Sequence, residues 1–124
     1  MGKPEGQIEN YLAAESAKRH YLCMKFISPS TDGVPDRIIM GKGLTFFVET
    51  KAPGEKTRKL QRSVIRKMMG YDAVVYVADT KQKVDTLLDE MDSIADRVSD
   101  IVPVFRDAIR NMPAMQATIQ EVNT

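Results

Sequence analysis

The chain has 124 residues, of which 43% are hydrophobic and 28% are charged, a composition that is typical of one compact globular domain and excludes a disordered or fibrous protein. The single cysteine, Cys23, excludes a disulfide framework, and the single histidine, His20, gives little support to a Cys/His or Ser/His mechanism. No apolar stretch approaches the roughly 18 residues of a membrane span, so we expect a cytoplasmic protein without a membrane partner.

Charge is strongly segregated along the chain, although the net charge is only +1. Between Lys51 and Lys67, seven basic residues and one acid give +6, whereas between Asp79 and Asp100 seven acids and three bases give −4. A surface built from the first segment can attract phosphate while the whole molecule stays near neutral.

The first part of the chain predicts a helix and a strand. Ile8, Tyr11 and Leu12 recur at helical spacing and predict an amphipathic helix over 5–18. The apolar and aromatic run 20–27 ends at a breaker-rich loop, as a strand does.

A hairpin is predicted next, from strands over 36–40 and 44–51 joined by the Gly-Lys-Gly turn at 41–43. Alternation along a strand places Glu49 and Lys51 on one face and Thr50 on the other. If the two strands pair through the short turn, Asp36 at the start of the first lies beside Glu49 at the end of the second.

The second half predicts a helix, a buried strand and another helix. Thr57 is a plausible cap for a helix whose apolar face carries Leu60, Val64 and Met68. The short run 73–78 predicts a buried strand. Further apolar spacing predicts a helix from Val84 to Val98, and two short apolar segments punctuated by prolines follow.

The carboxylates of Asp36 and Glu49, with the backbone carbonyl of Thr50 between them, are hard oxygen ligands that suit Mg²⁺ or Mn²⁺. Such a metal polarises a phosphodiester and activates water, and the ammonium of Lys51 can stabilise the negative charge that develops. The competing interpretation is an exposed ion pair between Glu49 and Lys51 at the end of a strand.

The order of these motifs closely resembles the VRR-NUC family, the virus-type replication-repair nucleases of the PD-(D/E)xK superfamily. The resemblance is carried by Gly-Val-Pro-Asp at 33–36, Val-Glu-Thr-Lys-Ala-Pro-Gly at 48–54 and Leu-Gln at 60–61, and it covers roughly residues 5–80. It implies an α/β fold with a restriction-endonuclease-like core, a mixed sheet of about four strands flanked by helices. The apolar segments after that core predict extra C-terminal helices.

The resemblance also implies roles for individual residues. Asp36 and Glu49 match the metal ligands of the family, Lys51 its catalytic lysine and Gln61 a helix glutamine that reaches into the site. Glu9 matches an acid of the first helix that completes the catalytic pocket and joins the metal ligands, with Glu5 and Glu15 as close competitors. Together with the basic segment, these matches give the predicted DNA-binding residues Lys25, Lys56, Arg58, Lys59, Arg62 and Arg66.

The predicted function is a DNA endonuclease dependent on Mg²⁺ or Mn²⁺, without an organic cofactor. No base-reading module is recognisable, so we expect structure-selective cutting of branched DNA, such as four-way junctions, in phage or bacterial replication and repair. Two alternatives remain open: a catalytically silent DNA-binding module, and a nuclease of RNA or of single-stranded ends.

The predicted organisation is a nuclease domain over 1–100 and a helical extension over 101–124. We expect the extension to pack on the same domain or to form a dimer interface. A homodimer would present two active sites to the two equivalent strands of a symmetric junction.

Overall fold

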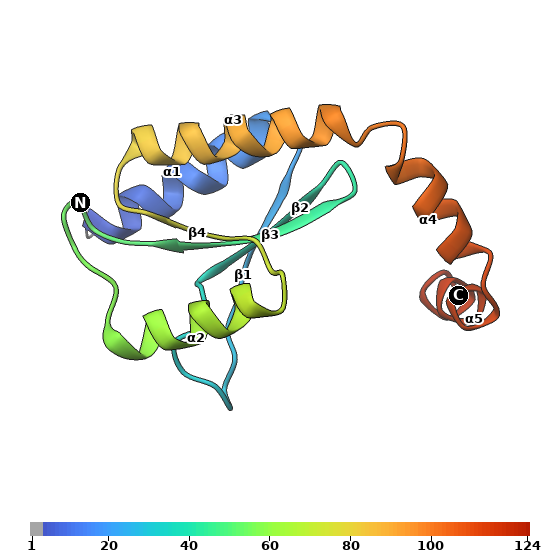
Figure 1. The fold of residues 1–124 in the computed structure, drawn as a ribbon, viewed down its shortest axis with the longest axis horizontal. Helices are drawn as coiled ribbons and strands as arrows, with labels where there is room; N and C mark the ends of the chain where they lie inside the picture. Colours follow the sequence, from blue (N-terminus) through green and yellow to red (C-terminus); the bar gives the residue numbers. More distant parts are fainter. Residues whose placement is uncertain (1–3) are drawn as a thin grey trace.

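The computed structural model describes residues 4–124, which form a four-stranded sheet and five helices (Figure 1). The elements are α1 (Pro4–Lys18), β1 (Leu22–Lys25), β2 (Arg37–Gly41), β3 (Leu44–Thr50), α2 (Lys59–Gly70), β4 (Val75–Ala78), α3 (Lys81–Arg97), α4 (Val102–Arg110) and α5 (Pro113–Val122). No helix within residues 4–124 has both the length and the apolar character needed to cross a membrane. The predicted α/β class is confirmed.

The sheet is mixed, with the strand order β1-β2-β3-β4. The first three strands are antiparallel, and β4 returns parallel to β3 after the α2 crossover. The predicted hairpin is present: Lys42 and Gly43 form its two-residue turn with φ of 56° and 81°, the positive values that match the twist of paired strands.

Helices cover the sheet on both faces, with α1 and α3 together on one and α2 on the other (Figure 1). The core lies under α1 and α3, where Leu12, Ile39, Phe46 and Leu88 are completely buried. The Tyr21 and Phe46 rings meet edge to face with centroids 5.7 Å apart, a favourable aromatic geometry.

The buried face of α2 differs from the prediction. Leu60 is 54% exposed, whereas Gln61 and Ile65 are buried, and Val64 and Met68 are only half-buried. The helix is rotated because the Gln61 amide points inward to a polar partner in the sheet, and the face that packs on the sheet therefore moves by about one residue. The helix cap is Arg58 rather than Thr57.

Several acids of α3 bind neighbouring elements. Asp92 accepts hydrogen bonds from Lys42 Nζ at 2.7 Å, Tyr21 Oη at 2.8 Å and Arg19 Nη1 at 3.2 Å. Burial opposes ionisation of Asp92, but the hydrogen bonds from Lys42 and Tyr21 outweigh it and leave its pKa below the ordinary value. This carboxylate therefore joins α3 to the end of α1 and to the hairpin turn.

Replacing Asp92 by Asn is expected to cost about 1 kcal/mol of unfolding free energy near neutral pH. A lowered folded-state pKa means that the ionised group stabilises the fold above its ordinary pKa, and this contribution is lost as the pH falls through the folded-state pKa. Urea unfolding of the wild type and of Asp92→Asn should show a gap at about pH 7 that is smaller at a pH below the ordinary aspartate pKa of about 3.9. A gap of equal size at both pH values would contradict the assignment.

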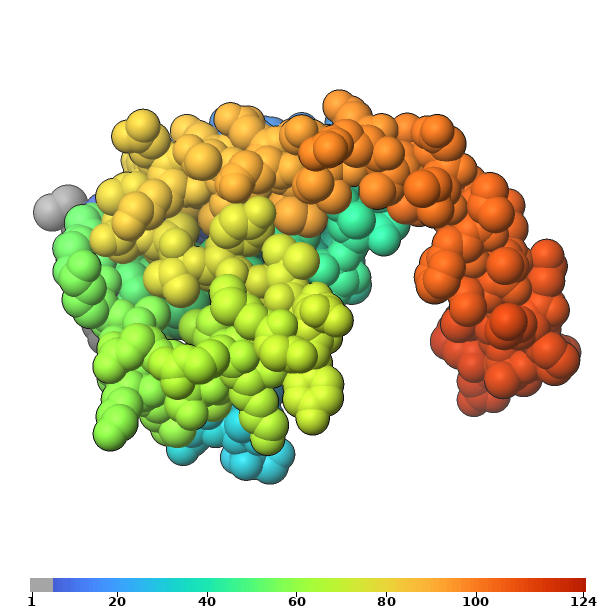
Figure 2. Space-filling model, in the orientation of Figure 1, coloured from blue at the N-terminus to red at the C-terminus, as the bar shows by residue number. Residues whose placement is uncertain are grey.

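The two C-terminal helices project from the body of the molecule as a separate lobe (Figure 2). Neither α4 nor α5 has a buried residue, so this segment does not cover the core, contrary to one of the two predicted roles. Its start is anchored: a Cβ on Gly43 would come within 2.2 Å of the Val102 side chain, so the hairpin turn and α4 touch there.

Candidate active site

The start of β2 and the end of β3 bring Asp36 and Glu49 together, as the hairpin geometry predicts. The Asp36 backbone N–H donates to Glu49 Oε1 at 3.2 Å. The Asp36 carboxylate accepts the backbone N–H of Thr50 at 2.8 Å and the Thr50 hydroxyl at 2.5 Å. Both carboxylates are thus held by hydrogen bonds on rigid strands.

The carboxylates of Asp36 and Glu49 are partly removed from water, and their negative charges repel each other. Glu49 is only 4% exposed. Burial raises the pKa of Glu49, and the charge of Asp36 raises it further. The charge of Lys51 offsets only part of this rise. Burial also raises the pKa of Asp36, and the hydrogen bonds from Thr50 offset this in part. A divalent cation between the two carboxylates would relieve this cost.

The donor set suits such a cation. Two carboxylates and a backbone carbonyl at Thr50 leave room for water ligands, which Mg²⁺ retains in most protein sites. Among the residues that the structure describes, no group of three or more His, Cys, Asp and Glu is arranged to hold a metal ion. Asp36 and Glu49 would therefore be the anionic ligands, and the remaining positions would be filled by the carbonyl, water and substrate.

Lys51 lies beside Glu49 on the same face of the sheet, as the strand alternation predicts. Its Nζ is 3.3 Å from Glu49 Oε2 and 3.6 Å from Glu55 Oε1. The Lys51 side chain is 6% exposed, so this pair is buried and the competing interpretation of an exposed strand-end pair is wrong. Glu55 was not predicted, and its position four residues after Lys51 is the signal that indicates it.

Gln61 connects the first turn of α2 to the carboxylate pair. Its Nε2 donates to Glu49 Oε2 at 2.9 Å, while its Oε1 accepts the backbone N–H of Arg58 at 3.0 Å. The amide therefore caps the helix and holds one oxygen of Glu49 at the same time. The structure brings Gln61 into the site, where the family resemblance expects it.

Glu9 lies near the site but is bound elsewhere. It forms an ion pair with Arg37, and its Oε1 is 3.8 Å from Lys25 Nζ. Its charge still contributes to raising the pKa of Asp36. Arg37, which directly follows Asp36, was not predicted from the sequence, and it binds the Glu9 carboxylate.

The two competing acids of α1 have different outcomes. Glu15 pairs with Lys18 on its own helix at 2.9 Å. The side chain of Glu5 lies outside the described part of the structure. Of the acids whose side chains are described, Glu9 is the one that reaches β2.

A basic surface begins next to the carboxylates. A hollow of about 420 Å³ is lined by Lys51, Glu55, Lys56, Arg58 and Gln61. The predicted phosphate-binding residues of this segment are all exposed: Lys56, Arg58, Lys59, Arg62 and Arg66. Arg62 also donates to the Thr57 carbonyl, which keeps its guanidinium close to the start of α2. Lys25 lies apart from them beside Glu9.

Comparisons with known proteins agree with this geometry. No family model matches the sequence. A protein of Acyrthosiphon pisum secondary endosymbiont phage 1, named as a candidate nuclease (p44), is 37% identical over 78 residues, which are 62% of this chain and 84% of that protein. A solved structure described as a VRR_NUC domain superposes with a TM-score of 0.66 and 23% identity, over 71% of this chain and 97% of the other.

Proposed function

The chain belongs to the VRR-NUC family of nucleases, and from this premise we propose that it is a DNA endonuclease dependent on Mg²⁺ or Mn²⁺, with Asp36, Glu49 and Lys51 in its active site. The observation that carries the proposal is that the half-buried Asp36 lies beside the buried Glu49, whose pKa its charge raises, and that a buried lysine lies next to them. Structural ion pairs avoid such repulsion, whereas sites for a divalent cation require it.

Each residue has a distinct task in the proposed mechanism. Asp36 and Glu49 would hold the metal, and Thr50 fixes the Asp36 carboxylate through its N–H and hydroxyl. When bound, the metal lowers the pKa of water and shields charge on the phosphate. Lys51 places its ammonium next to Glu49, where it can orient the attacking water or stabilise the charge that builds on the phosphate oxygens.

The proposed substrate is branched DNA, such as a four-way junction, cut in phage or bacterial replication and repair. The relation to a phage protein supports this setting, and we expect the enzyme to work in the cytoplasm of a bacterial or phage-infected cell. The alternatives are a silent DNA-binding module and a nuclease of RNA or single-stranded ends.

A cleavage panel tests the proposal. The purified chain is incubated with linear duplex, single strand, flap, four-way junction and RNA, each with Mg²⁺, Mn²⁺ or excess chelator. We expect the junction to be cut fastest, and only with metal. Binding without cutting would favour the silent module, and preferred cutting of RNA or single strands would overturn the proposed substrate.

We propose that a row of three exposed arginines binds the DNA backbone. The row consists of Arg58, which caps α2, and of Arg62 and Arg66 on that helix. Each lost phosphate contact should weaken binding to all sequences alike and reduce the slope of log K against log salt by about one unit. Fluorescence anisotropy over a salt series measures this slope. Arg97→Ala on α3 is the control, and its slope should stay at the wild-type value. An unchanged slope in the triple Ala variant would show that the row is a solvated face.

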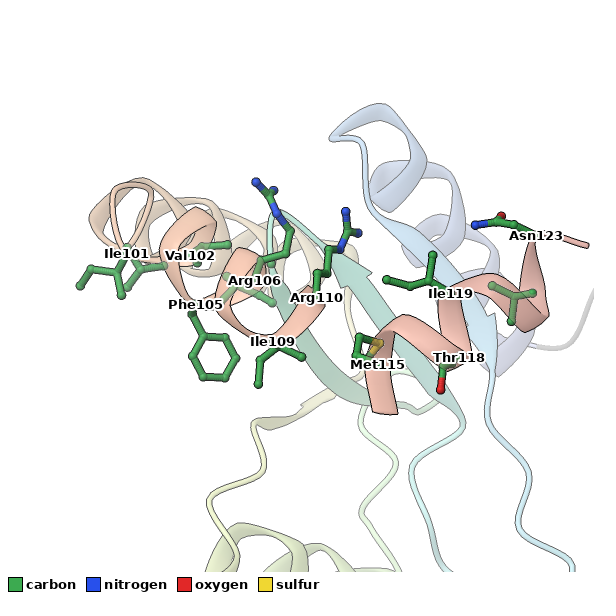
Figure 3. Close-up of a pocket in the computed structure, with 14 residues that line it drawn as sticks. Ile101, Val102, Phe105, Arg106, Ile109, Arg110, Met115, Thr118, Ile119 and Asn123 are labelled. Atoms are coloured by element: carbon green, nitrogen blue, oxygen red, sulfur yellow. The ribbon is translucent and has the colours of Figure 1, made fainter. Parts of the chain in front are cut away.

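We also propose that the C-terminal lobe forms a homodimer interface. An apolar hollow of about 1110 Å³ lies along α4 and α5 and reaches Gly43 and Leu44 of the hairpin. Figure 3 shows Phe105 and Ile109 on one side of α4, with Arg106 and Arg110 on another. A contiguous apolar surface of this kind is unusual on a monomer, and a second copy of the lobe would cover it isologously.

Phe105→Asp is expected to convert the dimer to a monomer without unfolding the chain, because Phe105 is 68% exposed and makes no core contact. Light scattering near micromolar concentration should give about twice 13.9 kDa for the wild type and about 13.9 kDa for the variant. The control is Asp107→Asn on the same helix, which should stay dimeric. A monomeric wild type would refute the interface.

A further inference from the structure

A third hollow lies beneath the C-terminal half of α2. It has a volume of about 440 Å³, within the range of about 300–1,000 Å³ that is typical of small-molecule sites. Phe26 and Phe47 form its floor, Val64 and Met68 its roof, and Tyr71 stands at the end of the helix. We call this space the aromatic hollow.

The aromatic hollow lies beneath the same helix as the candidate active site, and its lining residues are close to that site along β3 and α2. Phe47 and Glu49 are alternate residues of β3, so their side chains share a face about 7 Å apart. On the helix above, Val64 is one turn beyond Gln61, which binds Glu49. The hollow therefore lies roughly one nucleotide's length from the carboxylates, beneath the same helix.

Its walls suit a flat heterocycle. The Phe26 and Phe47 rings are 5.4 Å apart at 44°, and the ring of Tyr71 is 83% exposed. Ser28 and Thr31 also line the hollow, and each has a hydroxyl that can donate or accept a hydrogen bond with the polar edge of a base. Nucleobases stack on exposed aromatic rings irrespective of sequence.

The charge at the rim selects a polyanionic ligand. Lys67 is the one charged residue among the described residues that line the hollow, and α2 carries four basic residues and no acid: Lys59, Arg62, Arg66 and Lys67. A strand whose phosphates follow this helix toward Glu49 would bring a base over the hollow. An apolar peptide gains nothing from these cations.

The rim is also preformed on one side. Gly33 has a φ of 89°, and a Cβ there would come within 3.1 Å of the Leu60 carbonyl and of the Val64 side chain. The loop between β1 and β2 is thus held closely against α2. Binding would not require this wall to be ordered first.

We propose that the aromatic hollow binds one unpaired nucleobase of the substrate, next to the nucleotide that is cut. This inference rests on the proposed function and supplies its structure selectivity: fully paired duplex keeps its bases stacked, whereas a branch point or single-stranded gap offers a free base at low cost.

The test uses the full chain without divalent metal, so that binding is measured without cutting. Tyr71→Ala is expected to weaken binding of a duplex with one unpaired 2-aminopurine by about tenfold. Its affinity for the matched, fully paired duplex should change by less than about twofold, because phosphate contacts are unaffected. Tyr71→Phe, which keeps the ring, should bind like the wild type, and the quenching of 2-aminopurine should be lost only in Tyr71→Ala.

The outcomes separate this inference from the proposed function. Equal losses on both duplexes, or no loss on either, would overturn the base site while leaving a DNA-binding nuclease. A wild type that binds neither duplex at low salt would refute the proposed function itself. Because Tyr71 is exposed, folding should be unaffected. If Tyr71→Ala instead halves the mass in light scattering, a second copy occupies the hollow and the inference is wrong.

Discussion

Glu49→Gln is expected to lower the rate of DNA cleavage by about a thousandfold or more, and Asp36→Asn is expected to do the same. Each change keeps the shape of the side chain and removes one of two negative charges that would hold the metal. Cleavage is measured under single-turnover conditions with saturating Mg²⁺. Metal affinity is measured by calorimetry, and it should fall in both variants.

The matched control for these variants is Glu55→Gln. Glu55 is also a carboxylate beside Lys51, but its side chain is 44% exposed and it is not in contact with Asp36. We expect its loss of rate to be about tenfold, at the lower end of the range for groups that only support a site, because its side chain is partly exposed. Full activity of Asp36→Asn in Mg²⁺, with the wild type still inhibited by chelator, would place the metal elsewhere.

The second large effect concerns Lys51. Lys51→Ala should lower kcat by about a hundredfold or more while the affinity for Mg²⁺ changes much less, because the ammonium acts on water and on the transition state rather than on the metal. Single-turnover rates and metal titrations separate the two effects. Lys56→Ala is the control, since Lys56 lines the same hollow but is exposed. It should weaken DNA binding and leave kcat near the wild-type value. A loss confined to metal binding would contradict the role of Lys51.

The hairpin and its carboxylates were predictable because the rules that fix them are local. Alternation along a strand decides that Glu49 and Lys51 share a face, and a two-residue turn decides that Asp36 lies beside Glu49. The same rules placed Thr50 on the opposite face but gave no sign that its hydroxyl would bind Asp36, because that contact depends on the conformations of two side chains.

The contacts that were missed depend on packing between distant segments. The Glu9–Arg37 pair joins residues 28 positions apart, and nothing in the spacing of either segment indicates it. The rotation of α2 follows from one polar contact, between Gln61 and Glu49. This contact outweighs the burial of Leu60 that the sequence pattern predicted. The C-terminal segment was predicted to be helical, but α4 does not pack on the core. The sequence could not indicate this, because apolar residues are expected both in a core and on an exposed apolar surface.

The double contact of Gln61 makes the direction of its amide obligatory. The oxygen must face the Arg58 N–H and the nitrogen must face Glu49, so a flipped amide would lose both bonds at once. A helix start is the least stable part of a helix, and here its cap is completed only when the end of β3 is in place. We therefore expect α2 to form together with the end of β3, and native-state hydrogen exchange should show the amides of Arg58 and of the first turn opening together with the end of β3.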